Sequence, residues 1–197
     1  MKQTSNRAQI MRLTGLGLLT AIVIVLQLLG AFIRFGTFSI SLVLIPIVVG
    51  AAMYGVGAGG WLGAVFGATV LLSGDAAAFL AISIPGTVIT VMVKGIAAGL
   101  LSGLVFRLLD KKNTLLATVA AAVVCPVVNT GVFLLGCATF FLDAISSWAG
   151  GQSTFVYMIV GLVGLNFVVE LLINVVLSPT AVHLINLGRK HYTGKRA

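Results

Sequence analysis

Three polar residues interrupt one of the most apolar stretches of the chain. Asn166, Glu170 and Asn174 follow one another at intervals of four residues in "GLNFVVELLINVVLSPT", residues 164–180. On a helix this spacing places the three side chains in one stripe along a single face. A carboxylate at the centre of a bilayer costs about 2.5–3.5 kcal/mol on insertion scales, so Glu170 needs a partner or a function there. The stripe therefore indicates either hydrogen-bonded helix packing or one wall of a ligand site.

Lys94, in "VITVMVKGIAAG", is the second costly residue. At about 1.5 Å of rise per residue, Lys94 lies about 13 Å below the end of its helix, while Asn129 lies about 15–18 Å and Asn166 about 18 Å below theirs. A lysine near an aqueous face is a ready counter-ion for a carboxylate ligand. We therefore expect Lys94, Asn129 and Asn166 to line a ligand cavity, with Glu170 and Asn174 holding the helix packing beneath it. In the alternative interpretation, Lys94 neutralises Glu170, and the asparagines only link helices through hydrogen bonds.

The composition identifies the solvent around these residues. The 197-residue chain is 59% hydrophobic and 8% charged, whereas soluble domains carry about a quarter charged residues. Several apolar stretches approach or exceed the roughly 20 residues that cross a hydrocarbon core. The sequence therefore predicts an all-α integral membrane protein in one membrane domain, residues 1–197. Six transmembrane helices are expected, over residues 13–33, 38–54, 58–72, 85–109, 115–141 and 154–187.

The basic residues predict the orientation of these spans. Lysine and arginine are enriched in short cytoplasmic loops of membrane proteins. With six spans, ten of the twelve basic residues fall on one side, which predicts that both termini are cytoplasmic. These ten are Lys2, Arg7, Arg12, Arg107, Lys111, Lys112, Arg189, Lys190, Lys195 and Arg196. The longer loops, at residues 73–84 and 143–153, then lie outside, where long loops often gate or bind ligands.

Aromatic residues are candidates for the same cavity. We expect Trp61, Phe35 and Phe79 to contribute to it, although Trp61 could equally anchor its helix at the membrane interface. The expected cavity is not rich in aromatic residues, which disfavours a flat ring system that binds by stacking.

Small residues at intervals of four indicate close helix contacts, because packing drives helix association in lipid. Gly95, Gly99 and Gly103 are expected to pack inside the protein. Gly17 and Ala21, in the first span, are candidates for contact with another protein.

Several function classes are excluded by what the sequence lacks. It contains no GxxxxGKS-type nucleotide loop, no HExxH and no GxSxG motif, and therefore no convincing enzyme site. Cys125 and Cys137 are too few and lie in too apolar a setting for a metal site or a disulfide framework, and are expected to pack. The net charge of +8 is distributed between apolar spans and does not indicate nucleic-acid binding. No catalytic residue, metal or cofactor is expected, which leaves a binding protein or a transporter subunit.

The order of these segments resembles a known family. "LTGLGLLTAIVIVLQ", with Gly17 and Ala21 as its small-xxx-small motif, resembles the first helix of the substrate-binding S components of energy-coupling factor (ECF) vitamin transporters. "ISLVLIPIVVGAAMYGVGAGGWLGAVFG" resembles their second and third helices, and "NFVVELLINVVLSPT" resembles the end of their chains. The family motif is often Ala-xxx-Ala, so Gly17 departs from it.

The resemblance implies a mechanism and partners. A protein of this kind lies in the prokaryotic plasma membrane and captures a vitamin from outside with high affinity. It docks through its first helix on a transmembrane coupling subunit that carries two cytoplasmic ATPases, and then topples to release the vitamin inside. The sequence most resembles the pantothenate group, and one cation with several amides suits a small hydroxy-amide carboxylate. Another small vitamin or precursor, or a structural membrane subunit of envelope assembly, remains as an alternative.

Overall fold

The computed structural model describes residues 2–31, 34–35, 38–39 and 42–193, with side chains described for residues 9–31 and 42–189. In this part of the chain, helices are joined by turns and loops, and one short antiparallel pair of strands, β1 with β2, precedes α2. The elements in chain order are α1 (Lys2–Gly30), β1 (Arg34–Phe35), β2 (Phe38–Ser39), α2 (Leu44–Tyr54), α3 (Val56–Ser73), α4 (Ala77–Leu80), α5 (Ile84–Leu109), α6 (Thr114–Phe140), α7 (Leu142–Trp148), α8 (Thr154–Val156), the π-helix η1 (Tyr157–Gly164) and α9 (Leu165–Thr193).

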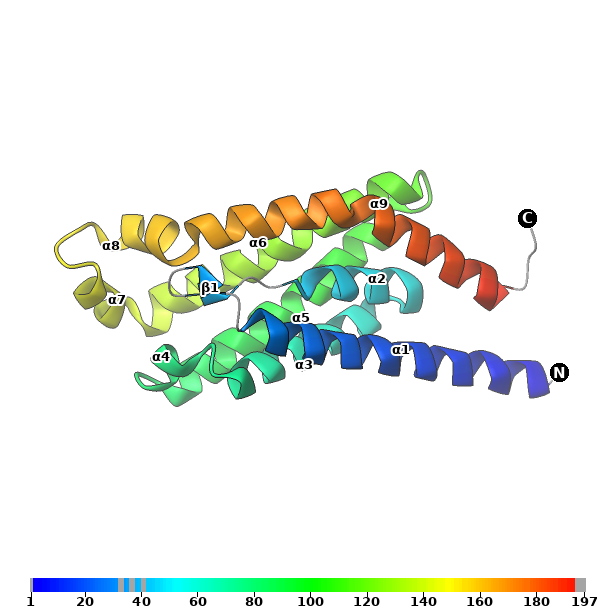
Figure 1. Cartoon of the computed structure of the whole chain (residues 1–197), viewed down its shortest axis with the longest axis horizontal. Helices are drawn as coiled ribbons and strands as arrows, with labels where there is room; N and C mark the ends of the chain where they lie inside the picture. Colours follow the sequence, from blue (N-terminus) through cyan, green and yellow to red (C-terminus); the bar gives the residue numbers. More distant parts are fainter. Residues whose placement is uncertain (1, 32–33, 36–37, 40–41, 194–197) are drawn as a thin grey trace.

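Five helical segments of the described chain are long and apolar enough to cross a membrane. They are Gln9–Gly30, Val56–Ser73, Ile84–Leu109, Thr114–Phe140 and Thr154–Arg189. Figure 1 shows them as an elongated bundle, with both chain ends and the turn between α5 and α6 at one end. The short helices α4, α7 and α8 lie at the opposite end. The bundle therefore places the two termini and the basic turn together, as the sequence predicts, while the side of the membrane that they occupy stays a prediction.

The second predicted span is wrong as one continuous helix. Of the described residues in 38–54, only Leu44–Tyr54 is helical, and 11 residues extend about 16 Å, roughly half of a hydrocarbon core. Pro46 explains where the helix begins, because proline is tolerated in the first turn, whose N–H groups have no helical partner, but breaks a helix interior. The residues before α2 instead include the two paired strands.

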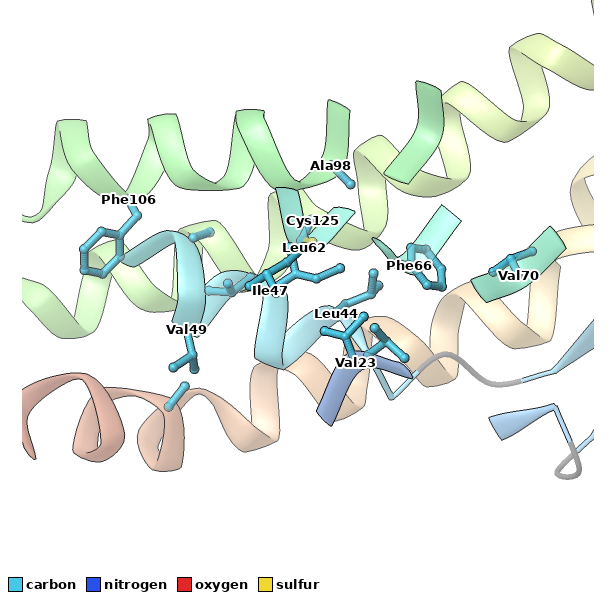
Figure 2. Packing of buried hydrophobic residues seen from close by; sticks show 14 of the residues in the cluster. Val23, Leu44, Ile47, Val49, Leu62, Phe66, Val70, Ala98, Phe106 and Cys125 are labelled. Carbon is cyan, nitrogen blue, oxygen red and sulfur yellow. The ribbon is translucent and has the colours of Figure 1, made fainter. Parts of the chain in front are cut away.

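The short helix α2 is the centre of the hydrophobic core. It packs against α1, α3, α5, α6 and α9, and Figure 2 shows Leu44 and Ile47 among side chains of the surrounding helices. Both side chains are fully buried. A helix surrounded by other helices in this way has little exposed surface, which explains why it is apolar although it is short.

Glycines bring α3 and α5 into direct contact. A methyl group added at Gly63 would collide with the carbonyl oxygen of Gly95, and one added at Gly59 would collide with that of Gly99. Close approach through small residues is typical of helix packing in lipid. The predicted internal packing of Gly95 and Gly99 is confirmed, and it sets the position of Lys94 beside this contact.

An ion pair joins the ends of three helices beside the chain termini. The Arg189 guanidinium donates to both carboxylate oxygens of Asp110, from Nη2 at 2.7 Å and from Nη1 at 3.1 Å, and Thr114 Oγ1 donates to Asp110 at 2.9 Å. Partial burial raises the pKa of Asp110, but the hydrogen bonds from Arg189 and Thr114 and the charge of Arg189 together bring this pKa below its ordinary value. The pair therefore ties α9 to the turn between α5 and α6.

Candidate functional site

A cavity lies in the half of the bundle that is away from the chain termini. It is lined from α1, α3, α4, α5, α6, η1, α9 and the loops at residues 75–76 and 141. The space that the centre of a water-sized sphere can occupy in it is about 80 Å³. By the same measure a single water needs about 10–15 Å³. The lining residues are Gln27, Val70, Asp75, Ala76, Phe79, Thr87, Thr90, Val91, Lys94, Asn129, Thr130, Phe133, Phe141, Leu162, Val163, Asn166, Phe167 and Glu170. The cavity therefore has room for a small organic molecule and contains both polar and aromatic walls.

Lys94 contributes a cation to this cavity. Its Nζ lies 5.5 Å from the ring centroid of Phe66 and 5.4 Å from that of Phe133, within the range in which aromatic faces attract a cation. Among the side chains that the structure describes, no carboxylate forms an ion pair with Lys94 and no acceptor hydrogen-bonds its ammonium. Glu170 therefore forms no direct ion pair with Lys94, but its charge still acts on that of Lys94, as the alternative interpretation expects. The three donors of the Lys94 ammonium make no hydrogen bond to a described residue, which leaves them available to an anion.

Three further polar groups in the wall have unused hydrogen-bonding capacity. Thr90 Oγ1, Asn129 Oδ1 and Asn166 Oδ1 are buried, and each lacks a partner among the described residues. The three side chains are only 4%, 5% and 9% exposed. A buried polar atom without a hydrogen bond costs about 1–3 kcal/mol. A ligand that forms hydrogen bonds with these groups would remove this cost, so they favour a polar molecule in the cavity.

Two carboxylates line the cavity as well. Asp75 Oδ2 accepts a hydrogen bond of 2.7 Å from Nε2 of Gln27, a residue that is only 2% exposed. Glu170, 6% exposed, is also engaged in an interaction. Glu170 was expected only beneath the cavity, and the structure instead includes it in the wall. Both carboxylates have partners within the protein, which distinguishes them from Lys94.

The cavity is richer in aromatic residues than the sequence led us to expect. Phe79 packs edge to face against Phe133, Phe141 and Trp148, with centroids 5.6, 5.0 and 5.6 Å apart. Phe79, Phe133 and Phe141 all line the cavity, together with Phe167. The expectation of an aromatic-poor pocket was wrong because three of these four residues had not been assigned to it. The contact between Phe79 and Trp148 joins α4 to α7 beside these rings.

The structure brings four of the predicted residues together and places others elsewhere. Lys94, Asn129, Asn166 and Phe79 line one cavity. Trp61 does not: its indole is 55% exposed, and its Nε1 donates to Thr20 Oγ1 at 3.2 Å, between α3 and α1. The glycines around Trp61 allow close packing of α3 against α5, and its ring faces outward beside α1.

Two other predicted residues, Phe35 and Asn174, are not among the described residues that line the cavity. Phe35 belongs to β1, and its side chain lies outside the described part of the chain. Asn174 is 1% exposed and is not among the lining residues. Its Nδ2 donates to the Glu170 carbonyl oxygen at 2.7 Å, which is a packing contact of the kind expected for it.

Sequence reasoning missed several lining residues that simple helical spacing could have found. Thr90 lies four residues before Lys94, Phe133 four after Asn129, and all of them line the cavity. Residues four apart share a helix face, so extending each predicted polar position by one turn identifies its neighbours. Gln27 had a signal too, as a lone amide in an apolar span, whereas nothing in the sequence alone joins Asp75 to it.

The first helix presents its small residues to the outside. Gly17 and Ala21 are exposed, and a methyl group added at Gly17 would have no atom within 4 Å. Inside the molecule, Val23 and Gln27 hold the opposite part of α1 against the bundle. The predicted docking residues therefore lie on an accessible face, which is necessary for a protein contact.

The described residues are arranged for binding. They contain no group of three or more His, Cys, Asp or Glu side chains that could hold a metal, and Cys125 and Cys137 are buried free thiols. A cation, unsatisfied polar groups and aromatic rings around one cavity are the kinds of group that bind small molecules in proteins.

Comparison with known proteins gives the family. The model of the family "ECF transporter, substrate-specific component" matches residues 11–182, which is most of the chain. Neither a curated protein nor a solved structure matches it. A substrate-specific component is the substrate-binding subunit of a membrane transporter and works with coupling and ATPase modules, in agreement with the apolar helices and the cavity. The chain is a member of the ECF transporter substrate-specific component family.

Proposed function

We propose that the cavity captures a small carboxylate vitamin of the pantothenate kind from outside the prokaryotic plasma membrane. The observation that carries this proposal is Lys94, a partly buried cation that lines the cavity and forms no direct ion pair with a described carboxylate. A carboxylate ligand would form the direct ion pair that Lys94 lacks. Charge-assisted hydrogen bonds of this kind are about twice as strong as neutral ones.

The remaining walls suit the rest of such a molecule. Amide and hydroxyl groups at Thr90, Asn129 and Asn166 complement ligand hydroxyls and amides. Phenylalanine rings complement a branched apolar body, because aromatic side chains bury large apolar area. A pantothenate-like molecule has a carboxylate, an amide, hydroxyls and a dimethyl-substituted carbon, and thus offers a partner for each wall.

The aromatic wall supports a second candidate. Phe79, Phe133, Phe141 and Phe167 could also hold a flat ring through stacking or edge contacts. A small planar vitamin or precursor with an acidic group would use the same Lys94. The two candidates differ in whether the ligand body is planar and aromatic or branched and aliphatic.

We also propose that α1 is the helix that meets the coupling subunit. Gly17 and Ala21 lie on its exposed face, and small residues allow a partner helix to approach closely. The subunit would then topple in the membrane to release its ligand inside, powered by the two ATPases of the complex. The predicted orientation, with both termini cytoplasmic, places the cavity in the outer half of the membrane before this movement.

A ligand screen tests the proposed function. The purified protein is heated with pantothenate, its alcohol analogue or small planar vitamin acids, and hits are titrated by calorimetry. A ligand that binds only the folded state stabilises it in proportion to RT ln(1 + [L]/Kd), about 2.7 kcal/mol at one hundred times Kd. Stabilisation by pantothenate and a weaker effect of its alcohol support the proposal. Stabilisation by planar acids alone favours the second candidate, and no stabilisation by any small molecule favours a structural membrane subunit.

A further inference from the structure

The first helix contacts the cavity through Gln27. Of the described lining residues, Gln27 is the one that comes from α1. Its side chain is only 2% exposed, whereas Leu28 and Leu29 beside it are 42% and 55% exposed. A buried amide on a helix that is otherwise largely exposed requires a partner inside the protein, and Gln27 has one in Asp75.

The partner belongs to a segment that lines the cavity. We call residues 74–83, between α3 and α5, the cavity loop. Gly74, with φ of 85°, ends α3 in the left-handed conformation that favours glycine and turns the chain into this loop. Asp75, Ala76 and Phe79 of the loop all line the cavity.

The loop is held on two sides. On one side, Phe79 packs against Phe133, Phe141 and Trp148. On the other, Asp75 Oδ2 accepts the 2.7 Å hydrogen bond from Gln27 Nε2. A hydrogen bond to an ionised acceptor is shorter and stronger than a neutral one, and the burial of Gln27 protects this bond from exchange with water. Opening the loop away from α1 must break the bond.

We propose that Gln27 is a positioning residue whose hydrogen bond to Asp75 fastens the cavity loop to α1 and keeps the cavity closed. The bond attaches the cavity loop to α1, which is also the helix that the proposed function assigns to docking. The inference rests on the proposed function only in taking the cavity as a ligand site. Its test uses no ligand, so its failure is distinguishable from a failure of the proposed function.

The test measures how often the loop opens. Ala76 is 4% exposed and lines the cavity, so a cysteine introduced there (Ala76→Cys) reacts with a soluble maleimide only when the loop opens. Labelling rates are compared in purified protein, with the protein lacking Ala76→Cys as the background for the two buried native thiols. Gln27→Leu should raise the rate about 10- to 150-fold, the change in opening expected from losing one hydrogen bond to a charged group.

A matched control separates this bond from general loosening of α1. Thr20 lies two helical turns before Gln27 on the same face and accepts the hydrogen bond from Trp61 Nε1, but it does not line the cavity. Thr20→Val removes that contact, and should change labelling of Ala76→Cys less than twofold. Equal increases for Gln27→Leu and Thr20→Val, or a change of less than twofold for Gln27→Leu, would overturn the proposal.

An exchange of partners tests the bond itself. Gln27→Glu places a carboxylate against Asp75, and should open the loop at least as much as Gln27→Leu. Combining Gln27→Glu with Asp75→Asn restores an amide–carboxylate pair with donor and acceptor exchanged. Labelling in this double variant should be well below the product of the two single effects, because the pairwise interaction is non-additive, while the further interaction of Asp75 is altered in both variants that carry Asp75→Asn. A double variant whose rate equals the product of the two single effects would overturn the assignment.

Discussion

Replacing Lys94 with methionine should abolish most of the affinity for a carboxylate ligand. Methionine retains a long unbranched side chain and makes favourable contacts with aromatic rings, so the packing against Phe66 and Phe133 is largely kept while the charge is lost. Removing one member of a desolvated charge pair costs about 2–5 kcal/mol, or roughly 30- to several-thousand-fold in Kd. This range is expected here, because no described carboxylate or hydrogen-bond acceptor makes a direct contact with the ammonium of Lys94.

Calorimetric titration with an acid and its alcohol separates charge from packing. Pantothenate should bind Lys94→Met at least about 30-fold more weakly than the parent, and the alcohol analogue should lose much less. Lys112→Met, an exposed change in the turn at the other end of the bundle, serves as the control and should leave both affinities unchanged. Equal losses for the acid and the alcohol in Lys94→Met would refute the charge pairing and leave Lys94 with a packing role.

Three other predictions concern the orientation, the docking face and the basic end of the bundle. Cysteines introduced singly at Asn113 and Gly150 should differ in intact cells, with an impermeant reagent labelling only position 150; labelling of position 113 alone would reverse the topology. Gly17→Leu combined with Ala21→Leu should abolish transport and leave ligand affinity within about twofold, because bulky side chains prevent close helix approach; uptake at the parental rate would exclude this face. The pKa of Asp110 is lowered in the folded state. The ion pair therefore adds about 1 kcal/mol or less to the free energy of unfolding, as is usual for a partly exposed pair. This stabilisation is present above the ordinary carboxyl pKa of about 3.9 and is lost as the pH falls through the lower pKa of the folded state. Thermal unfolding between pH 3 and pH 6 should therefore show a smaller acid-induced loss of stability in Asp110→Asn than in the parent, and identical losses would contradict the role of the ion pair.

Helical spacing and the cost of polar groups in lipid account for what the sequence could predict. Both are local properties: a charged or amide side chain in an apolar span has to face the protein interior, which is why Lys94, Asn129 and Asn166 were assigned to one site. The structure places all three around one cavity. The glycine contact of α5 follows from the same local logic, since Gly95 and Gly99 share one face of the helix.

Features that depend on tertiary arrangement could not be obtained in this way. Hydropathy does not distinguish a membrane span from a short helix buried among others. For this reason the sequence predicts one span over residues 38–54, whereas α2 begins at Leu44. The aromatic wall is assembled from the loop, α6 and α9, and only the fold brings Phe79 and Phe141 together. Trp61 shows the same limit, because both faces of its helix are apolar and glycine-rich, and the tertiary packing decides that its ring faces outward.

Equilibrium binding of labelled pantothenate to the purified protein, with the cavity filled by Asn166→Phe, tests the central claim most directly. Asn166 lines the cavity and is 9% exposed, so a larger ring at this position occupies the space assigned to the ligand. Trp61→Phe, outside the cavity, is the control for a changed aromatic residue, and unfolding temperatures establish that both variants are folded. The account predicts saturable binding at one site per chain in the parent and in Trp61→Phe, and none in folded Asn166→Phe. Saturable binding of equal affinity in all three proteins would contradict it, because the ligand would then occupy a place other than this cavity.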